Sequence, residues 1–173
     1  NNTLLRAKEL AHQGVELFVT PALRYFLYGD ITREMFFNDE QCLETFTQLD
    51  DTDIWCALKT WANHEDKVLA TLSSGLVSRR LFKVEIDSKP FSDEYKDGIV
   101  TRIADSLHID KDECSYLLCA AIHEKDMYTA ADDQIEILYN DGTTRDIAEA
   151  SDMFDLSLLQ KKVKKFYFCY HRV

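Results

Sequence analysis

Three basic side chains lie close together where a predicted helix gives way to a predicted strand. They are Arg79, Arg80 and Lys83, in the segment RRLFK. A guanidinium can hold a phosphate through two parallel hydrogen bonds, and an ammonium adds a mobile point charge. The spacing therefore predicts a phosphate-binding corner. The alternative is a solvated helix end, where Arg79 and Arg80 complement the helix dipole and pair with nearby acids.

Two successive helices must position this corner. Asp50 can N-cap the first helix, over residues 50–63, and Asp53 lies where the helix dipole favours an acid. The second helix, over 65–79, has an apolar face made of Val68, Leu69, Leu72 and Leu76. A strand is predicted to follow at 81–86. The corner thus joins the end of a helix to the start of a strand.

The sequence holds no strong pattern for catalysis. Metal-dependent hydrolysis needs three or four convergent His, Asp or Glu ligands. The densest acidic and histidine groups are residues 64–66 and 123–126, and adjacent side chains on a helix point apart. No glycine-flanked nucleophile is present, and no glycine-rich loop could cradle a phosphate. We therefore predict no catalytic residue, no metal ligand and no cofactor within this chain.

The composition is that of a globular protein with an acidic balance. The 173 residues are 46% hydrophobic and 29% charged, and the net charge is −11. Broad surfaces for nucleic acid or anionic membranes need clustered Lys and Arg, so this balance argues against both. No apolar run approaches the ~20 residues that span a bilayer. The five cysteines lack C-x-x-C spacing, which predicts reduced thiols in a cytoplasmic protein.

The pattern changes from helical to mixed near residue 80. Asn38 with Gln41 predicts a capping box in the first half. The second half predicts a strand at 81–86, a helix capped by Ser92, a buried strand at 116–122, a hairpin around Asn140-Asp141-Gly142, a helix at 156–163 and a strand at 165–171. This order resembles a ferredoxin-like split βαβ with an extra hairpin strand. We predict an α+β fold, with a helical segment at 1–80 and an α+β domain at 81–173.

The segment Leu49–Lys83 also resembles a known family. Its LDD-x-DI, W-x-x-H-x-D and R-x-LFK patterns are similar to the region after the catalytic core of HD-domain phosphohydrolases, including the deoxynucleoside triphosphate triphosphohydrolases. The resemblance implies a metal-dependent hydrolase that acts on nucleotides. The family holds its metal partly with a His-Asp dipeptide, and this sequence contains none. We therefore expect a carboxy-terminal region, with catalysis and its divalent metal in an amino-terminal part outside this sequence.

The same resemblance implies a site and partners. In nucleotide-regulated members the Arg and Lys of R-x-LFK contact an effector nucleotide at a subunit interface, and these positions correspond to Arg79 and Lys83. Arg80 takes the middle place, whose role does not carry over. The implied partners are the amino-terminal HD domain, a second copy of the chain and an effector nucleotide. The alternative is a non-catalytic oligomerisation or protein-interaction module with no nucleotide role, whose α+β half presents a sheet edge.

Overall fold

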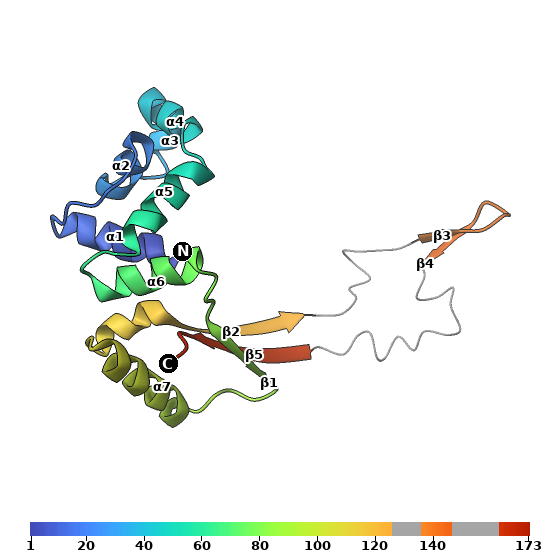
Figure 1. The fold of residues 1–173 in the computed structure, drawn as a ribbon. Coiled ribbons are helices and arrows are strands. Elements are labelled where there is room, and N and C mark those ends of the chain that lie inside the picture. Colours follow the sequence, from blue (N-terminus) through green and yellow to red (C-terminus); the bar gives the residue numbers. More distant parts are fainter. Residues whose placement is uncertain (126–135, 147–162) are drawn as a thin grey trace. The chain divides into compact units, whose positions relative to one another are not determined.

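The computed structural model describes residues 1–125, 136–146 and 163–173. In these ranges the helices are α1 (Asn2–His12), α2 (Pro21–Tyr28), α3 (Met35–Asn38), α4 (Glu40–Thr47), α5 (Asp51–Trp61), α6 (Lys67–Val77), α7 (Asp93–Leu107) and the 3-10 helix η1 (Asp112–Leu117). The strands are β1 (Lys83–Asp87), β2 (Leu118–Lys125), β3 (Glu136–Leu138), β4 (Thr144–Asp146) and β5 (Val163–Tyr170) (Figure 1). Helices combined with a small sheet confirm the predicted α+β class.

The chain divides into two compact units. The first, called here the helical unit, comprises residues 1–84, 92–119 and 169–173. The second unit comprises residues 85–91 and 120–168. The helical unit thus contains the whole segment predicted as helical, 1–80, and adds α7, η1 and the end of the chain. The predicted domain boundary near residue 80 stays a prediction.

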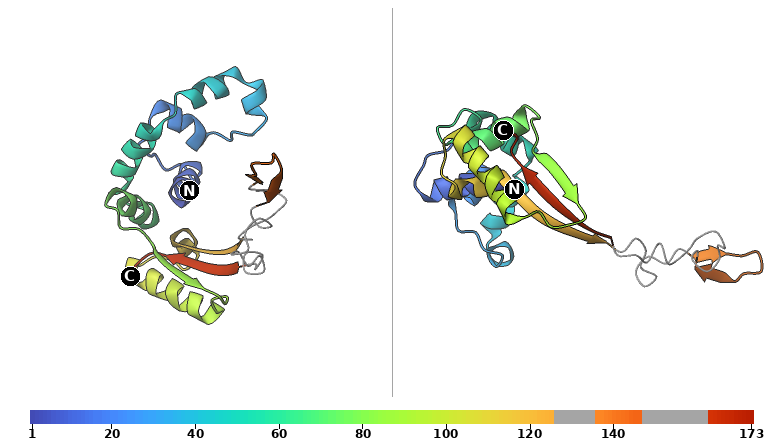
Figure 2. Two further views of the ribbon diagram at one scale, coloured as in Figure 1. Left: turned by 90° about the vertical axis from the view of Figure 1, so that its right-hand side faces the viewer. Right: turned by 90° about the horizontal axis from the view of Figure 1, so that it is seen from below.

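The strands form a three-stranded sheet and a separate hairpin. β5 lies between β1 and β2, and β3 pairs antiparallel with β4 (Figure 2). Gly142, at φ +84°, closes the turn that Asn140-Asp141-Gly142 predicted. A ferredoxin-like fold would place four strands in one sheet, whereas the strands described here divide between two sheets. The helix predicted at 156–163 lies outside the described residues except for its last position, Val163, where β5 begins.

Local sequence signals located most helix starts. Asp50 caps α5 in a full capping box, because its carboxylate accepts from the amides of Thr52 and Asp53 while the Asp53 carboxylate accepts from the Asp50 amide. Ser92 caps α7 as predicted. The predicted cap at Asn38 is wrong by one residue, since Asp39 caps α4 with a carboxylate that accepts two amides.

The prediction of a buried strand at 116–122 is also wrong in part. The first residues of that run complete η1, and β2 begins at Leu118. Ile122 is 61% exposed. An apolar run fixes neither the type of element nor its burial without a partner to cover it.

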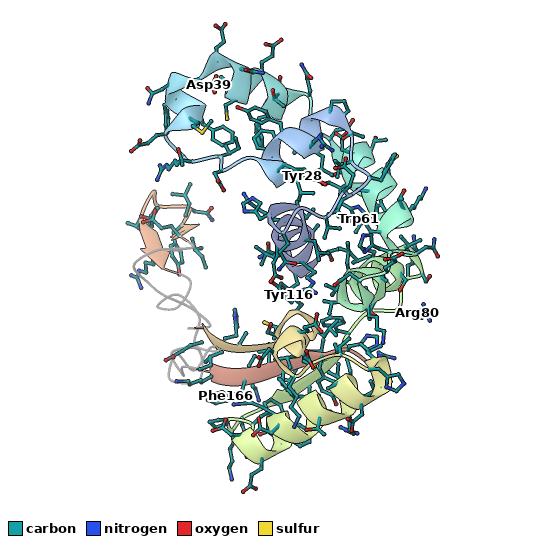
Figure 3. The ribbon with its side chains drawn as sticks, turned by 90° about the vertical axis from the view of Figure 1, so that its left-hand side faces the viewer. Tyr28, Asp39, Trp61, Arg80, Tyr116 and Phe166 are labelled. Carbon is teal, nitrogen blue, oxygen red and sulfur yellow. The ribbon has the colours of Figure 1, made fainter. Side chains whose placement is uncertain are left out.

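The helical core forms around Trp61, which is 1% exposed. Leucines and alanines of α1, α2, α5 and α6 pack with it, and α5 lies against α6 while α1 contacts both α2 and α6. The indole N–H of Trp61 donates to the carbonyl of Phe18 at 3.0 Å, so its polar atom is satisfied inside the core (Figure 3). Tyr28 stabilises the α1–α2 loop by donating to the Val15 carbonyl and accepting from the Leu17 amide.

A buried arginine links α1 to α6 and η1. Arg6 is 8% exposed, and its guanidinium donates twice to Asp66, at 2.6 and 3.3 Å, and once each to Glu9 and Glu113. The Arg6 Cζ atom lies 5.6 Å from the ring centroid of Tyr116, whose hydroxyl donates to Glu9. Several carboxylates therefore share one buried cation.

Removal of this cation should be costly. In the Arg6→Met variant the carboxylates of Asp66, Glu113 and Glu9 lose their shared partner, and breaking a buried ion pair costs about 3–5 kcal/mol. We expect a loss of this size in the free energy of unfolding, measured by urea denaturation. Arg24→Met is the matched control, because the Arg24–Glu16 pair is exposed and its removal should change the free energy of unfolding far less. Similar small losses in both variants would contradict this interpretation.

Candidate functional site

The end of α6 places the basic residues through a tight turn. After Val77, the Arg80 amide donates back to the Gly75 carbonyl at 2.8 Å, and the Arg79 amide donates to the Leu76 carbonyl at 3.2 Å. This pair of bonds is the Schellman motif. It folds the chain so closely that a Cβ at position 75 would lie 3.2 Å from the Arg80 carbonyl oxygen. Gly75 is therefore a packing site: the absence of a Cβ lets the turn bring the Arg80 carbonyl this close.

Arg79 occupies the position where this motif usually has glycine. Its φ is +55°, in the left-handed region. That conformation costs a residue with a Cβ roughly 1–2 kcal/mol. The sequence therefore places an arginine where glycine would be more stable. Strain of this kind is concentrated at functional positions.

Arg79 and Arg80 line a pocket of about 720 Å³ in the helical unit. The pocket is called here the first arginine pocket, and its lining is Thr71, Ser74, Gly75, Arg79, Arg80, Leu81, Leu107, His171 and Arg172. This lining contains three arginines and a histidine and no carboxylate. Figure 3 shows Arg80 beside the end of α6. Basic side chains therefore cluster in one pocket of a chain whose net charge is −11.

The arginines of the first arginine pocket, Arg79, Arg80 and Arg172, form no ion pair with any described carboxylate. Arg6 and Arg24, by contrast, both bind glutamates. The alternative in which Arg79 and Arg80 pair with nearby acids is therefore not what the structure shows. All three arginines line a pocket whose lining residues include no carboxylate side chain.

His171 contributes a titratable ring to the same pocket. Burial, together with the charge of Arg80, lowers the pKa of His171 below its ordinary value. Its backbone amide donates to the Leu117 carbonyl at 2.9 Å, which holds the residue after β5, and its ring lies edge-on to Phe82. The ring is therefore neutral near pH 7, with one N–H to donate, and an anion bound beside it would favour the imidazolium.

Lys83 lies in a different pocket from Arg79. The second arginine pocket, of about 540 Å³, is lined by Lys83, Tyr95, Arg102, Tyr170, Arg172 and Val173. The Lys83 ammonium is 5.5 Å from the centroid of the Tyr170 ring. Arg172 lines both pockets. The structure therefore brings Arg79 and Arg80 together, and relates them to Lys83 only through Arg172.

Sequence reasoning missed three of the basic residues that line the two pockets. His171 and Arg172 are neighbours at the far end of the chain from Arg80, and Arg102 lies on the α7 helix. No local spacing connects such residues, because the fold alone brings them to one place. One local signal could have drawn attention to His171 and Arg172: they lie at the end of the strand predicted at 165–171 and directly after it.

The described residues do not fit the divalent metal that the family resemblance implies. Across residues 1–125, 136–146 and 163–173, no group of three or more His, Cys, Asp or Glu side chains could hold a metal ion. His64, in the densest predicted group, instead accepts a hydrogen bond from the Asp66 amide at the start of α6.

The five cysteines are unpaired, with Cys42 and Cys114 buried. The helices described are all too short or too polar to cross a membrane.

One solved structure relates the chain to a hydrolase. No family model matches the chain, and no curated protein matches it. A crystal structure of a phosphohydrolase from Bacteroides thetaiotaomicron superposes with a TM-score of 0.91 and is 54% identical over 99% of this chain. The chain spans 42% of the length of that protein. The chain is therefore similar, in sequence and in fold, to part of a phosphohydrolase.

The positive φ of Arg79 predicts that glycine at this position would increase the free energy of unfolding. Arg79→Gly should raise the free energy of unfolding by about 1 kcal/mol, because glycine adopts positive φ without the Cβ penalty. Arg80→Gly is the matched control. Arg80 has no positive φ, so glycine there should lower stability by about 0.5–1 kcal/mol through the entropy of the unfolded chain. Urea denaturation of both variants measures the difference, and a loss in both would show that position 79 is unstrained.

Proposed function

We propose that this chain is a non-catalytic, carboxy-terminal region of an HD-domain phosphohydrolase that acts on nucleotides. Catalysis and its divalent metal belong to an amino-terminal HD domain outside this sequence, and that domain is a packing partner of this chain. The first arginine pocket binds the phosphate groups of an effector nucleotide. The chain thereby regulates an activity that it does not itself perform.

One observation carries this proposal. Arg79, Arg80, Arg172 and His171 surround one pocket that no carboxylate lines, in a chain of net charge −11. Guanidinium groups without an internal partner are poised to bind an external anion, and phosphate matches their paired N–H groups. The pocket volume of about 720 Å³ lies in the range of ligand sites, roughly 300–1,000 Å³.

The likeness to a phosphohydrolase supports the class of the parent protein. The 54% identity extends over nearly the whole chain, so a related role in a related protein is the simplest account. The R-x-LFK pattern supports the HD assignment and the nucleotide effector. The sequence contains no His-Asp dipeptide, and the proposal therefore places catalysis in another part of the protein.

Nucleotide binding can be tested by thermal shift. We expect dGTP, GTP, dATP or ATP to raise the melting temperature of the chain with concentration, since a ligand at 100 times its Kd adds about 2.7 kcal/mol. Arg80→Gln should weaken the affinity about tenfold or more, because hydrogen bonds to a charged group contribute roughly 1.5–3 kcal/mol. Arg33→Gln is the control, an exposed arginine that lines neither pocket.

Two outcomes would contradict the proposal. One is no shift with any nucleotide or with inorganic triphosphate. The other is an equal shift in the wild-type chain and in Arg80→Gln, which would place the anion elsewhere on the surface. A loss in Arg80→Gln with Arg33→Gln unchanged supports the pocket.

A second candidate function is association with a protein surface. The rings of Phe26, Phe36 and Phe46 contact one another, while Phe37 and Leu43 beside them are 77% and 50% exposed. Contiguous exposed apolar side chains mark interaction sites. This face suits self-association or packing on the amino-terminal domain, and it needs no nucleotide. It becomes the main account if the chain binds no phosphate compound.

A further inference from the structure

The second arginine pocket has the same chemical character as the first. Lys83, Arg102 and Arg172 line it together with Tyr95 and Tyr170, and none of its lining residues carries a side-chain carboxylate. All of these residues belong to the helical unit. A second concave cationic site is unexpected in a chain that holds 31 acidic and 20 basic residues.

Among the described residues, Arg102 forms no ion pair, although a carboxylate is close to it in sequence. It is exposed on α7, and Asp105 lies three residues further along the same helix, where an ion pair could form. Lys96 on that helix does form such a pair, with Asp93 at 2.9 Å. No ion pair to Arg102 occurs within the part of the chain that the structure describes. Arg102 instead lines the second arginine pocket.

Arg172 makes the two pockets one continuous cationic surface. It lines both, between Arg80 of the first and Arg102 of the second. A single arginine has five N–H donors in a planar fork, enough to contact two anionic groups at once. A ligand in the first pocket can therefore extend past Arg172 into the second.

We propose that the chain binds a ligand with two separate phosphate groups, one held by Arg79 and Arg80 and the other by Arg102 and Lys83. This inference rests on the proposed function, because the first group occupies the first arginine pocket. Tyr95, which is 39% exposed, adds an aromatic ring to the lining of the second arginine pocket. Such a ring suits the base of a nucleotide, because aromatic side chains stack on bases. The ligand class is a nucleotide phosphorylated at two positions.

Isothermal titration of the full chain tests this inference. The probes are adenosine 3′,5′-bisphosphate, adenosine 5′-monophosphate and inorganic triphosphate. We expect the bisphosphate to bind about tenfold or more tightly than the monophosphate, because the second phosphate gains charge-assisted hydrogen bonds. Arg102→Gln should weaken the bisphosphate more than the monophosphate and so reduce this ratio. Lys83→Gln is a second variant with the same expected direction.

The other variants separate the two proposals. Arg80→Gln should weaken every probe, whereas Arg33→Gln should change none. Equal affinities for the bisphosphate and the monophosphate, or a ratio unchanged in Arg102→Gln and Lys83→Gln, would overturn the two-phosphate inference while leaving the first pocket intact. If Arg80→Gln changes nothing, the proposed function fails as well. If triphosphate alone depends on Arg102, the ligand is a linear phosphate chain and the bisphosphate inference is wrong.

Discussion

The ion-pair network of Arg6 is the interaction on which the helical unit depends. A guanidinium with almost no exposure must keep every donor bonded, because an unpaired buried charge is far more costly than a paired one. Asp66, its strongest partner, also N-caps α6 by accepting the Leu69 amide. Burial raises the pKa of Asp66, but the hydrogen bonds from Arg6 and Leu69 outweigh it, so the pKa falls below its ordinary value. The start of α6 is therefore fixed to α1.

The position of α6 in turn determines the candidate site. Because α6 is held at Asp66, its last turn has a defined place, and the Schellman motif there directs Arg79 and Arg80 into the first arginine pocket. Glu113 connects the same network to η1, which leads into β2. The Leu117 carbonyl then accepts the His171 amide. One buried cation is thus connected through short structural steps to both sequence-distant halves of the pocket.

Local features of the fold were predictable from the sequence, and long-range ones were not. Asp50, Ser92 and Asn140-Asp141-Gly142 act on their own neighbours, so spacing alone located the helix starts and the hairpin. Arg79 and Arg80 were found for the same reason, since a helix end is a local signal. The Arg6 network joins residues 60 and 107 positions apart, and no periodicity reports such pairs. The same limit hid Arg102 and Arg172, which line the pockets from segments far from Arg79 in sequence.

The chain combines an acidic surface with a basic pocket, and the central claim is that this pocket binds phosphate. The most direct measurement is a crystal structure of the chain grown with sodium tungstate, a heavy tetrahedral anion that mimics phosphate and scatters anomalously. We predict an anomalous peak within hydrogen-bonding distance of the Arg79, Arg80 and Arg172 guanidinium groups. Ordered tungstate elsewhere with none at these arginines, or side chains of Arg79 and Arg80 bonded instead to carboxylates, would contradict the account.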